Sequence, residues 1–234
     1  MNLFRLFRLF RLTAACVLLA TLSAPARAAT PASAPARGAP AHVAPAPPTP
    51  GAPLPQKATF AGGCFWCEET TFEGLPGVLS VTSGYTGGTK LNPTYEEVSG
   101  GGTGHAEAVE VLFDPARITY ERLLDIFWRN VDPTQADGQF CDHGSQYRSA
   151  IFTHDAAQKR LAAESLRRLQ STPQRFKGAI VTEIATAGVF YPAEEYHQDF
   201  YRKNPARYHE YRAGCGRDRR LEQLWGKPER VLAH

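Results

Sequence analysis

The sequence of 234 residues is nearly free of methionine, because Met1 is its only example. It also lacks an excess of charge, since 26 lysines and arginines face 23 aspartates and glutamates. The absence of a basic field argues against a nucleic-acid or anionic-membrane partner. The apolar run at residues 12–24 is shorter than the about 20 residues that a membrane-spanning helix needs.

The N-terminal quarter of the chain has the composition of a targeting segment followed by a spacer. Arg5, Arg8 and Arg11 precede the apolar run, and Ala-Arg-Ala follows at residues 26–28. We therefore expect a secretory signal peptide at residues 1–28, with an uncleaved anchor as the alternative. Residues 29–56 are mostly alanine and proline and predict a linker. Residues 57–234 are expected to form one catalytic domain, exported and periplasmic, with 22 basic and 23 acidic residues beyond residue 28.

The most informative segment is Gly-Gly-Cys-Phe-Trp-Cys at residues 62–67, between an expected strand at residues 57–61 and an expected helix. A thiol at a helix start meets unpaired amide donors and the positive end of the helix dipole, which both favour the thiolate. Cys64 is therefore a candidate nucleophile. The rings of Phe65 and Trp66 could enclose a small apolar group. The alternative is a buried cysteine in an aromatic core.

Four cysteines remain after the expected signal peptide, and their number leaves two interpretations open. An even number permits two structural disulfides in an exported protein. A Cys-x-x-Cys pair at a helix start, formed by Cys64 and Cys67, favours redox activity instead. Glycines on both sides of Cys215 predict a mobile thiol that can travel to a partner.

The segment at residues 105–113 alternates polar and apolar residues and predicts a strand. The alternation places Glu107 on one face with Val109, Val111 and Phe113. A carboxyl group on such a face loses hydration, so its pKa should rise and it could donate a proton near neutral pH. The alternative is a solvated acid at the strand end. Further strands are expected at residues 78–85, 150–152 and 178–186, and helices at 119–130, 155–170 and 193–202.

Five motifs occur together and in order: residues 63–66, 84–88, 92–95, 104–107 and 144–148. With them, the chain from about residue 59 to residue 211 resembles the peptide methionine sulfoxide reductases of the A type. The resemblance implies an α+β fold, a two-layer sandwich around a mixed β-sheet with a ferredoxin-like core and extensions. It also implies reduction of methionine sulfoxide, free or in proteins, with preference for the S epimer at sulfur.

The resemblance implies roles for individual residues. Cys64 matches the family's nucleophile, and Glu107 matches its acid. Tyr95 and Tyr147 match the residues that bind the sulfoxide oxygen. Phe65 and Trp66 match the pocket for the substrate methyl group, and Asp142 matches a polar residue of that pocket. A second thiol would condense with the Cys64 sulfenic acid, and an external dithiol such as thioredoxin would restore the enzyme. No bound cofactor or metal is implied, and we expect a monomer.

The sequence does not identify the resolving cysteine, which is the thiol that condenses with the Cys64 sulfenic acid. Cys215 is the first candidate because its glycines provide reach, and Cys67 is the second because it lies one helical turn from Cys64. Cys141 is interpreted as a packed thiol, and a relay of two disulfides is not expected.

Two other functions are compatible with the same residues. The first is a general thiol-disulfide oxidoreductase built on residues 64–67, although its Phe-Trp dipeptide is bulky. The second is a metal-binding module that uses Cys64, Cys67, Cys141 and His143. Two further histidines, His197 and His209, are expected to be surface or capping residues.

Overall fold

The computed structural model describes residues 53–172 and 176–227. The predicted signal peptide and all but the last four residues of the predicted linker lie outside this part of the chain. Gln56, the last of those four, already belongs to the first strand. Among the described residues, no helix combines the length and the apolar character needed to cross a membrane.

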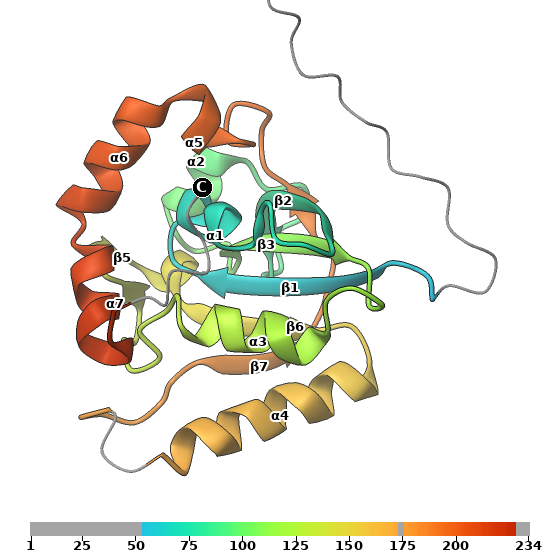
Figure 1. Ribbon diagram of the computed structural model, residues 1–234. Helices are drawn as coiled ribbons and strands as arrows, with labels where there is room; N and C mark the ends of the chain where they lie inside the picture. Colours follow the sequence, from blue (N-terminus) through green and yellow to red (C-terminus); the bar gives the residue numbers. More distant parts are fainter. Residues whose placement is uncertain (1–52, 173–175, 228–234) are drawn as a thin grey trace, which may run out of the picture. The chain divides into compact units, whose positions relative to one another are not determined.

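The main sheet has six strands in the order β7-β6-β1-β3-β2-β8 (Figure 1). All neighbours are antiparallel except β6 and β7, which are parallel. The strands are β1 (Gln56–Gly62), β2 (Val78–Thr86), β3 (Ala106–Phe113), β6 (Ser149–Thr153), β7 (Glu183–Thr186) and β8 (Tyr191–Pro192). A separate two-stranded sheet pairs β4 (Gly138–Gln139) with β5 (Asp142–His143).

Seven α-helices and one short 3-10 helix accompany the strands in the described part of the chain. They are α1 (Phe65–Phe72), α2 (Tyr95–Ser99), α3 (Tyr120–Trp128), the 3-10 helix at Ser145–Tyr147, α4 (Ala156–Gln170), α5 (Phe200–Lys203), α6 (Pro205–Gly214) and α7 (Arg217–Trp225). The chain order β1-α1-β2-β3-α3-β6 with the sheet order β6-β1-β3-β2 is the ferredoxin-like arrangement. The predicted α+β fold class is confirmed.

The core lies between one face of the sheet and helices α1, α3 and α4. Phe60 of β1 stacks on Phe72 of α1 and Phe127 of α3, with ring centroids 5.0 and 5.1 Å apart. Val109 and Val111 of β3 are buried in the same cluster. Because strand side chains alternate between faces, Glu107 lies on this helix-covered face too.

The helices begin where capping residues predict. Thr119 accepts a hydrogen bond from the Arg122 amide at the start of α3, and Asp155 accepts one from the Gln158 amide at the start of α4. These two predicted helices, and the strands at 57–61, 78–85 and 105–113, are confirmed within one or two residues at each end.

The C-terminal third differs from the sequence-based expectation. The helix expected at residues 193–202 is wrong, because Asp199 has a φ of +52° and α5 begins only at Phe200. The amide of Asp199 donates to Glu69 Oε1 at 2.9 Å, which fixes this turn against α1. The strand expected at 178–186 is shorter and begins at Glu183. The tail forms α6 and α7, with Cys215 between them.

Candidate active site

The candidate site begins where β1 ends and α1 starts. Cys64 is the N-cap of α1, and its carbonyl oxygen accepts hydrogen bonds from the amides of Cys67 and Glu68. The two preceding glycines allow a close approach of other segments. Gly63 has a φ of +94°, and a Cβ there would lie 2.7 Å from Cβ of Gln139. The glycine pair thus lets the chain turn from strand to helix beneath packed side chains.

Gly62 permits a prediction about the packing beneath the candidate nucleophile. A Cβ at this position would lie 2.6 Å from Cδ of Glu68 and 2.7 Å from Cγ1 of Val131. We expect Gly62→Ala to destabilise the domain by about 1–3 kcal/mol, the usual cost of overpacking. Gly188→Ala is the matched control, since no atom lies within 4 Å of its added Cβ. Urea unfolding measures both, and equal stabilities would contradict the packing described here.

The two free cysteines, Cys64 and Cys67, form a buried thiol pair that is 7% and 1% exposed. A hydrogen bond from the Cys64 thiol, helped by Arg217 and Arg212, lowers the pKa of Cys67 to about 6. Burial and the neighbouring Cys67 raise the pKa of Cys64 well above its usual value. The two thiols therefore ionise as a linked pair, in which a charge on one opposes a charge on the other. Burial thus opposes the effect of the helix start, which favours a thiolate at Cys64.

Glu107 lies against the start of α1. Its Oε2 accepts a hydrogen bond from the Phe65 amide at 3.0 Å, and the residue is 2% exposed. Burial raises the pKa of Glu107 to about 8, although the hydrogen bond from Phe65 opposes the shift. The predicted rise in pKa is confirmed, and the alternative of a solvated acid is excluded. The carboxyl group is therefore protonated and able to donate at neutral pH.

Tyr95 at the start of α2 and Tyr147 at the end of the 3-10 helix lie near the same buried charges. Burial raises the pKa of Tyr95 to about 12, and the charges of Glu107 and Cys64 add to the shift. Burial also raises the pKa of Tyr147, with smaller effects from Glu107, Tyr95, Asp142 and Cys64. The predicted nucleophile, acid, phenols and Asp142 therefore lie close enough to influence one another's ionisation. Both phenols keep their protons at neutral pH and can donate hydrogen bonds.

The two aromatic residues after Cys64 have different surroundings. Phe65 is buried and packs against Tyr85, while Trp66 is only partly buried and stacks on Phe200 with ring centroids 3.6 Å apart. The Trp66 indole N–H donates to Nδ1 of His197 at 3.0 Å. His197 is 2% exposed, so the expectation that it is a surface or capping residue is wrong; His209, in contrast, is exposed. The role of Phe65 and Trp66 as a pocket for a methyl group stays a prediction.

Sequence analysis missed the residues that hold this site from distant segments. Glu194 accepts hydrogen bonds from the Tyr95 amide at 2.9 Å and the Tyr85 hydroxyl at 2.8 Å. Arg217 of α7 donates to the Gly62 carbonyl at 3.1 Å and to Glu68 Oε1 at 2.5 Å. These contacts join residues about 100 to 155 positions apart, so no local pattern indicates them.

The remaining two cysteines form a disulfide, Cys141–Cys215, with a Cα–Cα distance of 5.0 Å. The interpretation of Cys141 as a packed thiol is therefore wrong, and Cys215 is not a free mobile thiol in this structure.

The alternative metal site is not assembled either. Within residues 53–172 and 176–227, the groups that could hold an ion are Cys141 with Asp142 and Cys215, and Glu69 with Glu73 and Asp199. Neither group contains the predicted set of Cys64, Cys67, Cys141 and His143.

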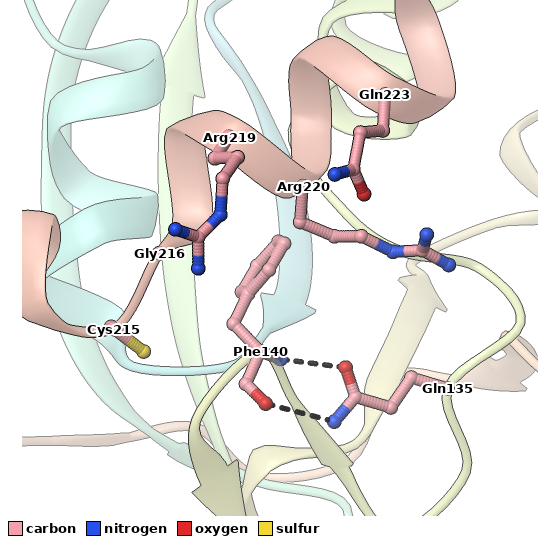
Figure 2. A pocket seen from close by; sticks show the side chains of 7 residues that line it. All are labelled: Gln135, Phe140, Cys215, Gly216, Arg219, Arg220 and Gln223. Atoms are coloured by element: carbon pink, nitrogen blue, oxygen red, sulfur yellow. Dashed lines mark hydrogen bonds between the residues drawn. The ribbon is translucent and has the colours of Figure 1, made fainter.

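A pocket of about 330 Å³ lies beside this disulfide (Figure 2). Phe140, Cys215 and two arginines of α7, Arg219 and Arg220, contribute to its walls. The backbone of Phe140 makes two hydrogen bonds with the Gln135 side chain across its floor. Neither Cys64 nor Cys67 lines this pocket, so it is separate from the candidate catalytic centre.

Comparison with known proteins identifies the family of this chain. A family model described as peptide methionine sulfoxide reductase matches residues 56–229. The chain is 54% identical over 170 residues to the peptide methionine sulfoxide reductase MsrA of Bacillus licheniformis, across 73% of this chain and 93% of that protein. It is also 54% identical over 169 residues to the MsrA of Bacillus subtilis, across 72% of this chain and 95% of that protein.

Solved structures show the same relationship. The reduced form of Mxr1 from Saccharomyces cerevisiae superposes with a TM-score of 0.61 and 34% identity, over 65% of this chain and 87% of that one. Methionine sulfoxide reductase A of Corynebacterium diphtheriae superposes with a TM-score of 0.58 and 35% identity, over 66% of this chain and 77% of that one. The chain therefore belongs to the peptide methionine sulfoxide reductase family, within its MsrA group.

Proposed function

We propose that this domain reduces the S epimer of methionine sulfoxide, free or within proteins, with Cys64 as the nucleophile. The observation that supports this most directly is a buried, electrostatically linked thiol pair near a carboxyl group whose pKa is raised to about 8. Family membership supplies the reaction class. The epimer preference follows from the resemblance described above.

The first step needs an activated sulfoxide oxygen and a thiolate at Cys64. Tyr95 and Tyr147 hydrogen-bond the oxygen, and protonated Glu107 donates its proton as charge develops there. The proton of the Cys64 thiol moves to Cys67 along the hydrogen bond between them while Cys64 attacks the substrate sulfur. The oxygen passes to Cys64, which is oxidised to sulfenic acid, and the substrate leaves as methionine. Trp66, with Phe65 behind it, packs against the substrate methyl group, and Asp142 contacts its polar part.

The second step restores the thiols. The Cys67 thiol attacks the sulfenic acid sulfur of Cys64, a disulfide forms, and the oxygen leaves as water. An external dithiol then reduces the Cys64–Cys67 disulfide by exchange and becomes a disulfide itself. Cys67 is supported as the resolving residue because it already hydrogen-bonds Cys64. The other candidate, Cys215, is bonded to Cys141.

Removal of Cys67 tests this second step. We expect Cys67→Ser to produce one methionine per chain in a single turnover and then to retain a sulfenic acid on Cys64. Dimedone labelling followed by mass spectrometry detects that acid. In the wild type the label should be absent, since the disulfide forms first. A Cys64–Cys215 disulfide in the variant, without dimedone label, would show instead that Cys215 resolves the intermediate.

The cellular setting is part of the proposal. We propose that the enzyme acts after export, in the periplasm, as a monomer without bound cofactor or metal. A thioredoxin or a thioredoxin-like dithiol protein would regenerate it. The basic, apolar and small-residue parts of residues 1–28 support export. The near absence of methionine supports a repair role in oxidising surroundings, because the exported chain would not be its own substrate.

The proposed reaction is tested by supplying the S and R epimers of a blocked methionine sulfoxide separately, with dithiothreitol as reductant. We expect turnover of the S epimer and little or none of the R epimer. Chromatography of the blocked methionine measures both. If a folded and reduced protein leaves the S epimer unchanged, the proposal fails, and general disulfide exchange becomes the function to examine.

A further inference from the structure

The Cys141–Cys215 disulfide joins two segments that both reach the candidate catalytic centre. Cys141 lies between β4 and β5 and is exposed, while Cys215 caps the end of α6 and is partly exposed. The two residues are 74 positions apart in the sequence. The bond thus fixes the corner between α6 and α7 to the β4–β5 hairpin.

A hydrogen bond lies next to this covalent bond and joins the same two segments. The Tyr211 hydroxyl donates to Oδ2 of Asp142 at 2.5 Å, and Asp142 directly follows Cys141. Tyr211 lies one helical turn before Cys215, whose amide donates to the Tyr211 carbonyl at 2.8 Å. The Tyr211 ring packs edge-on against Trp66, with centroids 5.7 Å apart. The side chain is therefore held by Asp142 and Trp66, and its backbone by the helix end at Cys215.

The hydroxyl of Tyr211 also reaches the sulfur of Cys64. A hydrogen bond from this phenol lowers the pKa of Cys64, against the larger effect of burial. In the resting site the phenolic proton is donated to Asp142, and Tyr211 can donate it to Cys64 instead when the thiolate forms. Phenols donate stronger hydrogen bonds to ionised partners than to neutral ones. Tyr211 consequently contacts a reacting atom.

Arg217, close to Cys215 in the sequence, also acts on the thiol pair. Arg217 follows Cys215 by two residues, is 1% exposed, and lies with its guanidinium 4.5 Å from the ring centroid of Phe140. Phe140 directly precedes Cys141. The charge of Arg217 lowers the pKa of Cys67. Residues on both sides of the disulfide therefore act on the two thiols.

We propose that the Cys141–Cys215 disulfide is a permanent brace that positions Tyr211 at the Cys64 sulfur, with Tyr211 a further catalytic residue. The proposal deepens the proposed function and rests on its assignment of Cys64 and Cys67 as the reacting pair. The brace itself is not oxidised or reduced in the catalytic cycle. Its Cys215 end lines the pocket in Figure 2.

The test measures thiol ionisation in protein without substrate, so that it does not depend on sulfoxide reduction. The rate of Cys64 alkylation by iodoacetamide is followed from pH 5 to 10, with peptide mass spectrometry to separate Cys64 from Cys67. Tyr211→Phe should raise the apparent pKa of Cys64 and slow its alkylation at pH 7 by about tenfold, the effect of a lost hydrogen bond to a charged group. The double variant Cys141→Ala with Cys215→Ala should shift the profile in the same direction.

Combination of the substitutions separates positioning from general stability. If the disulfide acts through Tyr211, Tyr211→Phe should have little further effect in the double cysteine variant. Tyr120→Phe is the matched control, because its buried hydroxyl has no hydrogen-bond partner among the described residues. Thermal melting identifies any variant that has unfolded, and Tyr211→Phe alone, which keeps the ring, then remains to test the contact with Cys64.

Three results would overturn the inference. An unchanged Cys64 profile in Tyr211→Phe would show that the phenol does not act on the thiol. An unchanged profile in the folded double cysteine variant would show that the disulfide does not position Tyr211. Disulfide mapping during turnover with limiting dithiothreitol provides the third, since appearance of a Cys64–Cys215 or Cys67–Cys215 bond would show that the brace is consumed. Failure of the S epimer assay, in contrast, would refute the proposed function without altering these profiles.

Discussion

Replacing Cys64 by serine is expected to lower the rate of sulfoxide reduction by at least about 10³-fold, because the serine hydroxyl stays protonated and cannot accept the oxygen as a thiolate does. The fold should survive, since the two side chains have nearly the same shape and Cys64 makes no side-chain cap of α1. Initial rates with the S epimer and dithiothreitol measure the loss.

The informative comparison for this variant is Cys67→Ser. Both substitutions remove one thiol from the same buried pair, so a general disturbance of the site would affect them alike. Under the proposed mechanism Cys64→Ser releases no methionine, whereas Cys67→Ser, which lacks the proton acceptor, still releases one methionine per chain but more slowly. A burst from Cys64→Ser, or equal burst sizes from both variants, would be incompatible with Cys64 as the nucleophile.

The second large effect is expected from Glu107→Gln. The amide keeps the shape of the carboxyl group and its acceptor for the Phe65 amide, but it has no proton to give. General acid catalysis contributes about 10²–10⁴-fold in enzymes, and we expect a decrease in kcat/KM in that range. Glu110→Gln is the control on the same strand, because Glu110 pairs with Lys57 at 2.9 Å and is partly exposed.

The pH dependence of kcat/KM tests the role of Glu107 independently of the substitution. The thiol pair gains its charge as pH rises through about 6, the pKa of Cys67, so activity should increase there. Glu107 loses its proton as pH rises through about 8, so activity should then decrease. The wild-type profile is expected to be bell-shaped, and Glu107→Gln should lack the alkaline limb. Retention of that limb in the variant would assign it to another group.

Local sequence patterns predicted the two central side chains because their geometry depends on nearby residues. The glycine pair and the following helix fix Cys64 at a helix start, and the alternation of β3 fixes Glu107 on the helix-covered face. Both inferences needed only the period of a strand and the position of a helix end.

The charge distribution of the thiol pair could not be predicted in the same way. The helix start favours a thiolate at Cys64, but burial opposes it, and Tyr211 of α6 and Arg217 of α7, which are far away in the sequence, also act on the pair. The buried Arg217 is an example, since it contacts Gly62 across 155 positions. Four cysteines allow three disulfide connectivities, so composition alone could not select Cys141–Cys215 either.

The C-terminal segment shows how local composition can mislead. Glycines on both sides of Cys215 suggested mobility, yet Gly214 ends α6 and Gly216, with a φ of +69°, is the N-cap of α7. The same flexibility that would permit movement here permits a tight corner between two helices. The corner brings Tyr211 and Arg217 to the thiol pair.

The measurement that tests the central claim most directly is a single turnover without reductant. Protein with Cys64 and Cys67 reduced is mixed with an excess of the S epimer, and methionine and free thiols are counted after quenching with an alkylating reagent. We predict one methionine per chain, with Cys64 and Cys67 joined in a disulfide and no longer alkylated. Absence of methionine, or methionine formed while both thiols remain free, would contradict the account.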